Sequence, residues 1–208
     1  MSQKLIDAII EMREEDALKI TQELLDGGAD PMDVLEACRQ AMDIIGKRFQ
    51  TGESFIPELI MAGEMMTAIT DILKPHMTED AEEKKLGKVV IGTVQGDIHD
   101  IAKNIVAFML DLSGFEVTDL GVDVPPAKFV EAAKESGAKI VGLSGFLTLA
   151  FEPMKDTVAA LQAAGLDDVR VMIGGGQVNE QIREYTGADA YGDDAMEAVA
   201  IAQQWAKE

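Results

Sequence analysis

The fold is decided by one stretch, residues 89–106, which reads Val89-Val90-Ile91-Gly92-Thr93-Val94-Gln95-Gly96-Asp97-Ile98-His99-Asp100-Ile101-Ala102-Lys103-Asn104-Ile105-Val106. Its first residues are apolar and β-branched, which is typical of a buried strand. Its later apolar residues recur at helical spacing, at positions 98, 101, 105, 106 and 109. The stretch therefore predicts a strand, a tight loop and an amphipathic helix.

His99 stands in the predicted loop, and ligands of open α/β sheets bind at the loops that leave the carboxyl ends of strands. The nearby helix N-terminus disfavours a charged imidazole, so the neutral ring could give a lone pair to a metal. Asp97, two residues earlier, could accept the other ring N–H and fix the tautomer. A histidine after a strand more often has a structural role, so these two residues alone favour that role over metal ligation.

After Lys88, segments with strand character alternate with helical patterns. Strands are predicted at 88–93, 115–119, 139–143, 169–173 and 189–191, and helices near 100–113, 126–136, 151–164, 178–185 and 194–207. This alternation predicts a doubly wound, flavodoxin- or Rossmann-like parallel sheet of five strands in the order 2-1-3-4-5. The loops after the first and third strands then share one crevice. At the same edge, Gly174-Gly175-Gly176 either leaves room for a flat, bulky group near the backbone or forms an ordinary turn.

The first 75 residues show helical spacing and no strand pattern, which predicts a small helical bundle. Two helices are expected within 4–26 with an interruption near 14–16, a third from Asp30-Pro31 to Gly46, a break at 48–57, and a fourth from Pro57 to Lys74. The charged run 78–85 is predicted to be a linker, and 78–86 a hinge. The expected domains are therefore a helical one at 1–86 and an α/β one at 87–208.

The composition limits the classes of partner. The chain has 208 residues and a formal net charge of −20, which repels nucleic acids and anionic membranes. Aromatic residues make up 5% while methionines number 12, so an aliphatic, adaptable core is expected. The single cysteine, Cys38, cannot form an intramolecular disulfide. Without a membrane-length apolar run or signal-peptide features, the sequence predicts a cytoplasmic protein.

Three loop motifs together resemble a known signature. Asp97-x-His99-x-x-Ala102, Ser144-x-Phe146 and Gly174-Gly175 are similar to the Asp-x-His-x-x-Gly, Ser-x-Leu and Gly-Gly motifs of the cobalamin-binding domain. Cobalamin-dependent methionine synthase and the corrinoid proteins of methyltransferase systems share this domain. The segment from Gly46 to Glu58 resembles the helical cap module that precedes it. The resemblance covers essentially the whole chain, with Ala102 and Phe146 standing where the family has glycine and leucine.

The resemblance implies a role for each matching residue. His99 would be the lower axial ligand of cobalt, Asp97 would hold its imidazole, and Ser144 would extend this hydrogen-bond relay. The other implied cofactor-binding residues are Gly96, Ile98, Asp100, Phe146, Thr148, Gly174, Gly175 and Asp194 in the α/β half, with Phe49, Ile56 and Leu59 in the cap over the reactive face. The nearby methionines Met61, Met65 and Met66 are expected in the core of the bundle.

The resemblance implies a cobalamin or related corrinoid cofactor, with a methyl group carried on its cobalt. The chain would be a subunit of a multi-component methyltransferase rather than a free-standing catalyst. Its implied partners are a substrate-specific methyltransferase, a second methyltransferase that uses tetrahydrofolate or coenzyme M, and a reductive activase. The methyl donor stays open among methylamines, glycine betaine, methanol and aryl methyl ethers.

Two alternatives belong to other classes. A cobalamin-dependent sensor that acts through protein partners shares the corrinoid domain and a helical cap. A receiver-like module phosphorylated on an aspartate shares the flavodoxin-like fold. The receiver ranks last, because it requires an acidic pair at the end of the first strand, and residues 89–93 and the following loop do not supply it.

Overall fold

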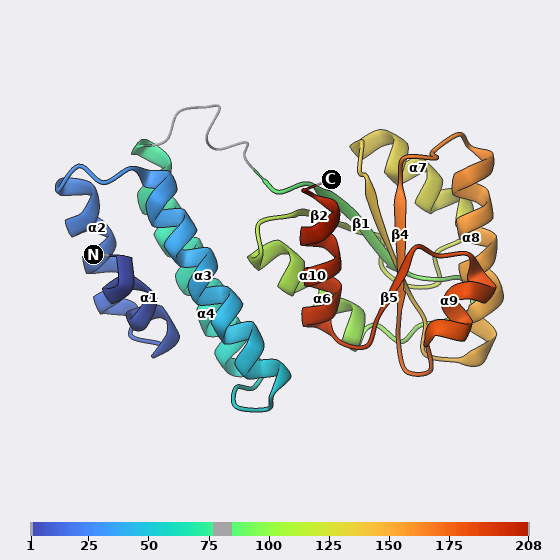
Figure 1. The fold of residues 1–208 in the computed structure, drawn as a ribbon, viewed down its shortest axis with the longest axis horizontal. Coiled ribbons are helices and arrows are strands. Elements are labelled where there is room, and N and C mark those ends of the chain that lie inside the picture. Colours follow the sequence, from blue (N-terminus) through green and yellow to red (C-terminus); the bar gives the residue numbers. More distant parts are fainter. Residues whose placement is uncertain (1, 77–84, 208) are drawn as a thin grey trace. The chain divides into compact units, whose positions relative to one another are not determined.

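The computed structural model describes residues 2–76 and 85–207, and the chain forms two compact units at 1–85 and 86–208 (Figure 1). The predicted linker at 78–85 and hinge at 78–86 lie outside the described residues, apart from Lys85 and Leu86. The first unit is helical and the second contains the sheet.

The helical unit is built from four α-helices followed by a short 3₁₀ helix. These are α1 (Ser2–Ile10), α2 (Glu14–Asp26), α3 (Pro31–Gln50), α4 (Ile56–Leu73) and η1 (Lys74–His76). The helix α3 begins where the sequence predicts, because the Asp30 carboxylate accepts a hydrogen bond from the Met32 N–H at 2.9 Å. At the start of α4 the Glu58 carboxylate accepts the Phe55 N–H at 2.9 Å.

Two boundaries in this unit differ from the prediction. The break between α1 and α2 lies at residues 11–13, and Glu14, Glu15 and Asp16 form the first turn of α2. Acidic side chains stabilise the positive end of a helix, so they mark its start rather than an interruption. Likewise α3 continues through Phe49 to Gln50, and the chain leaves the helix only at Thr51 and Gly52, where Gly52 has a φ of 76°.

The second unit confirms the predicted fold class, a five-stranded parallel sheet in the order β2-β1-β3-β4-β5. Its strands are β1 (Lys88–Thr93), β2 (Glu116–Asp119), β3 (Ile140–Ser144), β4 (Arg170–Gly174) and β5 (Ala190–Gly192). Its helices are α6 (Ile101–Leu112), α7 (Pro126–Ser136), η2 (Thr148–Ala150), α8 (Phe151–Ala163), α9 (Glu180–Thr186) and α10 (Ala195–Trp205).

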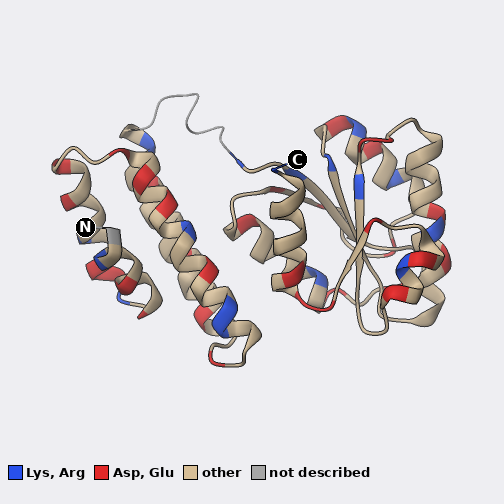
Figure 2. Cartoon of the chain, in the orientation of Figure 1, with Lys and Arg blue, Asp and Glu red and all other residues tan. Residues whose placement is uncertain are grey.

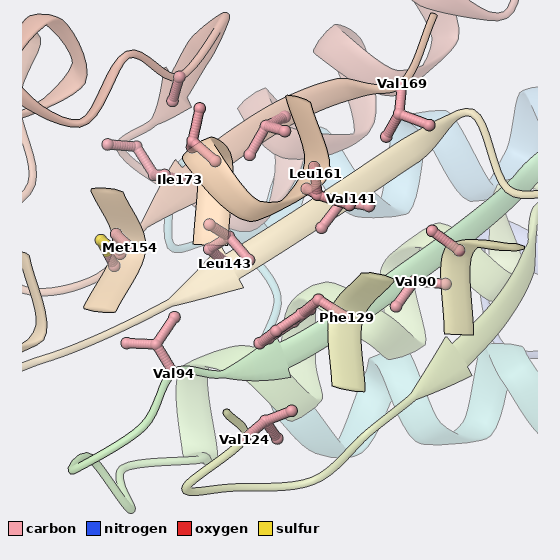
Figure 3. Packing of buried hydrophobic residues seen from close by; sticks show 14 of the residues in the cluster. Val90, Val94, Val124, Phe129, Val141, Leu143, Met154, Leu161, Val169 and Ile173 are labelled. Atoms are coloured by element: carbon pink, nitrogen blue, oxygen red, sulfur yellow. The ribbon is translucent and has the colours of Figure 1, made fainter. Parts of the chain in front are cut away.

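Helices cover both faces of the sheet. The helices α6 and α10 pack together on one face, and α7 and α8 pack together on the other, with α9 beside α8 (Figure 1). Figure 3 shows the core beneath α7 and α8, where Val90, Val141 and Leu143 from the strands meet Phe129 and Met154 from the helices. This packing fixes the carboxyl ends of β1, β3 and β4 along one edge.

Acidic positions are spread over the helices of both units (Figure 2). Together they give the chain its net charge of −20. Among the described helices, none is both long enough and apolar enough to cross a membrane.

Candidate functional site

A tight turn follows β1 and carries the candidate ligand. The Asp97 N–H donates to the Val94 carbonyl at 3.1 Å, and Gly96 within this turn has a φ of 83°. Glycine adopts such a left-handed conformation without steric cost, which explains its place here. The chain then runs irregularly through His99 until α6 begins at Ile101.

The Asp97 carboxylate joins the loops after β1 and β3. Its Oδ1 accepts hydrogen bonds from the His99 N–H at 3.0 Å and lies 2.7 Å from His99 Nδ1, while its Oδ2 accepts the N–H groups of Phe146 at 2.7 Å and Leu147 at 3.0 Å. The residue is only 1% exposed. Burial raises the pKa of Asp97, but hydrogen bonds from Leu147, His99 and Phe146 outweigh it, so the pKa lies well below its ordinary value.

This contact determines what the His99 ring can do. An ionised carboxylate only accepts hydrogen bonds, so Nδ1 carries a proton and Nε2 is left with a lone pair. The side chain is 50% exposed, and within the described residues the ring makes no other hydrogen bond. The Thr93 hydroxyl donates to the His99 carbonyl at 3.1 Å, and the Phe146 ring lies 4.7 Å from the imidazole between centroids. His99 therefore presents an oriented nitrogen ligand at the sheet edge.

Glycines bring the backbones of the loops after β3 and β4 into contact. The Gly145 N–H donates to the Gly174 carbonyl at 3.1 Å. A Cβ on Gly175, whose φ is 127°, would lie 2.0 Å from the Gly145 carbonyl oxygen. A Cβ on Gly176 would lie 2.6 Å from the Phe146 ring, which explains how the larger phenylalanine fits here. Backbone rather than side chains thus lines this part of the edge.

The surroundings of His99 fit a large, flat and partly apolar metal cofactor. Six exposed apolar side chains come from the loops and helix starts at this edge: Ile98, Ile101, Val122, Phe146, Leu147 and Leu149. Ile98 and Ile101 are 71% and 75% exposed, which is costly for isoleucine unless a ligand covers it. The donor chemistry agrees, because a neutral imidazole held by a carboxylate is a common metal ligand.

Other predicted site residues lie at the same edge. Ser144 ends β3 and its carbonyl accepts the Val94 N–H at 3.0 Å, but its hydroxyl makes no hydrogen bond to Asp97 among the described residues. In this structure the amides of the next loop contact Asp97, and the role of Ser144 in the relay stays a prediction. Thr148 is exposed in η2, and Gly174 ends β4. Asp100 precedes α6, where its carbonyl accepts the Asn104 N–H at 2.7 Å.

Asp194 has a clear local role at the start of α10. Its carboxylate accepts the Glu197 N–H at 2.9 Å, while the Glu197 carboxylate accepts the Asp193 N–H at 2.7 Å. This reciprocal pair is a helix-capping arrangement. The structure thus accounts for Asp194 without a ligand, and its predicted cofactor contact stays a prediction.

The predicted cap residues of the helical unit differ in exposure. Ile56 is 45% exposed, Phe49 is half-buried, and Leu59 is only 1% exposed. Leu59 therefore packs in the core of its unit, because its position on α4 points inward, and it does not offer a surface as predicted. Met65 is buried as expected, whereas Met61 is 47% exposed and does not lie in the core.

Three contributors to the site were missed from the sequence. The amides of Phe146 and Leu147 hold Asp97, the Thr93 hydroxyl holds the His99 carbonyl, and Asp123 contacts the Gly96 turn. Backbone amides leave no trace in residue types, so no sequence signal could have found them. Thr93 could have been found, because a polar residue at the end of an apolar strand indicates a side chain with a hydrogen-bonding role.

Comparison with protein families gives two matches. A model of a B12 binding domain matches residues 87–200, and a second B12 binding domain model matches residues 1–74. The dimethylamine corrinoid protein of Methanosarcina barkeri is 41% identical over 204 residues, which cover 97% of this chain and 95% of the relative. Trimethylamine corrinoid protein 1 of Methanosarcina acetivorans is 40% identical over 197 residues, which cover 93% and 91%.

Two solved structures are similar over nearly the whole chain. A cobalamin-binding protein from Desulfitobacterium hafniense DCB-2 has a TM-score of 0.83 and 40% identity, covering 99% of this chain and 98% of that one. The methanol:cobalamin methyltransferase complex MtaBC of Methanosarcina barkeri has a TM-score of 0.82 and 28% identity, covering 98% of this chain and 78% of that one.

Proposed function

Because the chain belongs to the family of B12-binding corrinoid proteins of methyl-transfer systems, its cofactor is a corrinoid, and we propose that it carries a methyl group between two methyltransferases. The main structural support is the His99 imidazole, which Asp97 holds at 2.7 Å with Nε2 free at the sheet edge. Within this proposal, His99 is the lower ligand of the cobalt.

The bound corrinoid supplies a cobalt centre that can accept and release a methyl group. The protein's part is to hold the imidazole and to store a proton near it. Asp97 keeps the proton on His99 Nδ1 and is itself fixed by the amides of Phe146 and Leu147. We include Ser144, at the end of β3, as a nearby hydroxyl that could join this network when the cofactor is bound.

The same edge offers two kinds of surface to the cofactor. The exposed apolar side chains Ile98, Ile101 and Leu149 would cover the macrocycle and exclude water. The bare backbone at Gly174 and Gly175 would leave space for the nucleotide tail, which we propose runs past Thr148. Gly96, Asp100 and Asp194 complete the proposed contacts.

We also propose that the helical unit shields the reactive face of the cofactor. Its α4 helix exposes three apolar side chains, Ile56, Ile60 and Met61, and Phe55, the residue before the helix, is exposed as well, although soluble helices normally bury such residues. Phe49, half-buried near the end of α3, would add to this surface, and Leu59 would support it from within the core.

We propose methylamines as the source of the methyl group and a methyltransferase specific for them as the first partner. Relatives about 40% identical over nearly the whole chain are named for dimethylamine and trimethylamine, whereas the methanol system's chain is 28% identical. A second methyltransferase, using tetrahydrofolate or coenzyme M, would take the group onward, and a reductive activase would maintain the cofactor.

Spectroscopy of the reconstituted chain tests ligation. The purified full chain is loaded with hydroxocobalamin, and its absorption spectrum, and its electron paramagnetic resonance spectrum after reduction to the Co(II) state, are compared with those of His99→Ala. We expect a histidine-ligated form that the variant loses. His76→Ala is the matched control, because His76 is the other histidine and is exposed in η1. Identical spectra for the wild type and His99→Ala would contradict the proposal.

Methyl transfer from defined donors tests the substrate class. The loaded and reduced protein is incubated with the methyltransferase of a dimethylamine, trimethylamine or methanol system and the matching donor. We expect methylation with a methylamine system at least about tenfold faster than with the methanol system, which corresponds to about 1.4 kcal/mol. Equal or faster methylation from methanol would refute the assignment of methylamines.

A further inference from the structure

We propose that Asp123 is a positioning residue for His99, an inference that rests on the proposed ligation of the corrinoid by His99. Asp123 lies in the loop of residues 120–124 that follows β2, outside all the motifs of the signature. It makes two contacts with the turn that carries the histidine. Its Oδ1 accepts the Gly96 N–H at 2.8 Å, and its own N–H donates to the Asp97 carbonyl at 3.0 Å.

The backbone of Asp123 is held in an unusual conformation. Its φ is 52°, in the left-handed region, where among the described residues Met12 is the other non-glycine. Asp and Asn tolerate this region better than most residues, but at some cost. Residues held this way persist when their surroundings fix them, and they are frequent at functional sites. Both contacts of Asp123 depend on this conformation, because it turns the N–H and the carboxylate toward the same turn.

The loop that carries Asp123 is itself attached to the end of β1. The Thr93 N–H donates to the Gly121 carbonyl at 2.9 Å, and the Val124 N–H donates to the Thr93 carbonyl at 3.0 Å. At its start, the buried Lys103 side chain forms an ion pair with Asp119. The loop is therefore a fixed support rather than a loose connection, and Asp123 transmits that support to the turn.

The two sides of Asp97 are thus held by different loops. The loop after β3 holds its carboxylate through the amides of Phe146 and Leu147, and Asp123 holds its carbonyl and the preceding residue. Since Asp97 Oδ1 sets the place of His99 Nδ1, a shift of the turn moves Nε2 as well. Ligands of a metal must be held to within a fraction of an ångström, so the second support affects ligation.

The inference is tested with Asp123→Gly and Asp123→Asn. The glycine variant keeps the left-handed backbone but lacks the acceptor, whereas the asparagine variant keeps both. Hydroxocobalamin is titrated into each full-length protein, and the fraction in the histidine-ligated form is read from the spectrum. Amide hydrogen exchange of Gly96 is measured by NMR without cofactor. Asp168→Gly, which removes a carboxylate that forms an exposed ion pair with Lys139, is the matched control.

We expect Asp123→Gly to bind hydroxocobalamin about 3- to 10-fold more weakly, the effect of losing one partly exposed hydrogen bond. Its histidine-ligated fraction should fall and its Gly96 amide should exchange several-fold faster, while Asp123→Asn and Asp168→Gly stay close to the wild type. A merely structural role would leave the spectrum of the bound fraction unchanged.

Three results would overturn the inference. One is an Asp123→Gly variant that matches the wild type in affinity and spectrum while His99→Ala loses the histidine-ligated form, which leaves the proposed function intact. Another is weakened binding with unchanged exchange at Gly96. The third is a His99→Ala spectrum equal to that of the wild type, which removes the proposed function and the role of Asp123 together.

Discussion

Replacing Asp97 with asparagine should strongly destabilise the α/β unit even without cofactor. Asp97 is 1% exposed and accepts from three backbone N–H groups and one imidazole N–H, two on each carboxylate oxygen. In the Asp97→Asn variant one oxygen becomes an amino group, so two of the four donors lose their acceptor whichever way the amide lies.

The magnitude follows from these contacts. A hydrogen bond to a charged group contributes about 1.5 to 3 kcal/mol, and a donor left buried without a partner costs about 1 to 3 kcal/mol. Two lost contacts therefore amount to roughly 3 to 6 kcal/mol. The imidazole can shift its proton to Nε2 and so recover one of them, which leaves an expected loss of about 2 to 4 kcal/mol in the free energy of unfolding.

Urea unfolding followed by tryptophan fluorescence measures this loss of stability specifically for the α/β unit. Trp205 is the single tryptophan and lies in α10, so its signal reports the α/β unit. Asp168→Asn is the matched control, because Asp168 forms an exposed ion pair with Lys139, which typically contributes under about 1 kcal/mol. A loss for Asp97→Asn no larger than that of the control would refute the role given to the four contacts.

Three further predictions concern other features. Burial raises the pKa of Cys38 to about 12, so the unfolded chain loses the thiol proton at a lower pH than the folded chain does. Between pH 9 and 12 the free energy of unfolding of the helical unit should therefore fall by up to about 1.4 kcal/mol per pH unit, measured by urea unfolding followed by circular dichroism. The Cys38→Ala variant should lack this slope. Asp119→Ala should lower the free energy of unfolding, measured by the same Trp205 assay, by roughly 2 kcal/mol more than Lys103→Met does, because it leaves a buried ammonium unpaired; equal losses would contradict this. Gly176→Ala should cost about 1 to 3 kcal/mol in the same assay, and less in a Phe146→Leu background; additive losses would show that the ring is not the obstacle.

The architecture of the α/β unit could be predicted because it depends on patterns that a sequence displays. The run Val89–Val94 is buried between two helical layers and is therefore apolar apart from Thr93, and β1 begins and ends where predicted. The strands β2 to β5 each begin one residue later than predicted, since strand ends depend on pairing with neighbours. The strand order was predicted as the common flavodoxin-like order of five-stranded doubly wound sheets.

The candidate site could be predicted only in part. Asp97 and His99 are two residues apart, so local geometry was enough to expect their contact. The partners of Asp97 Oδ2 are backbone amides some fifty residues away in the sequence, whereas the motif pointed to the Ser144 side chain. Leu59 could not be separated from Ile56 without knowing which side of α4 packs inward. Asp123 lies outside the motifs, and its role rests on a backbone angle that residue types do not report.

The contact between Gly145 and Gly175 limits how this edge could be redesigned. Where a side chain lines a cavity, a smaller residue enlarges it, but here main chain already touches main chain. Smaller residues could not be introduced here to make room for a bulkier nucleotide tail, because both positions are already glycine. If the proposed tail runs past these glycines, room for a larger one has to come from the exposed side chains of the loop after β3 and of η2, such as Phe146 and Leu149.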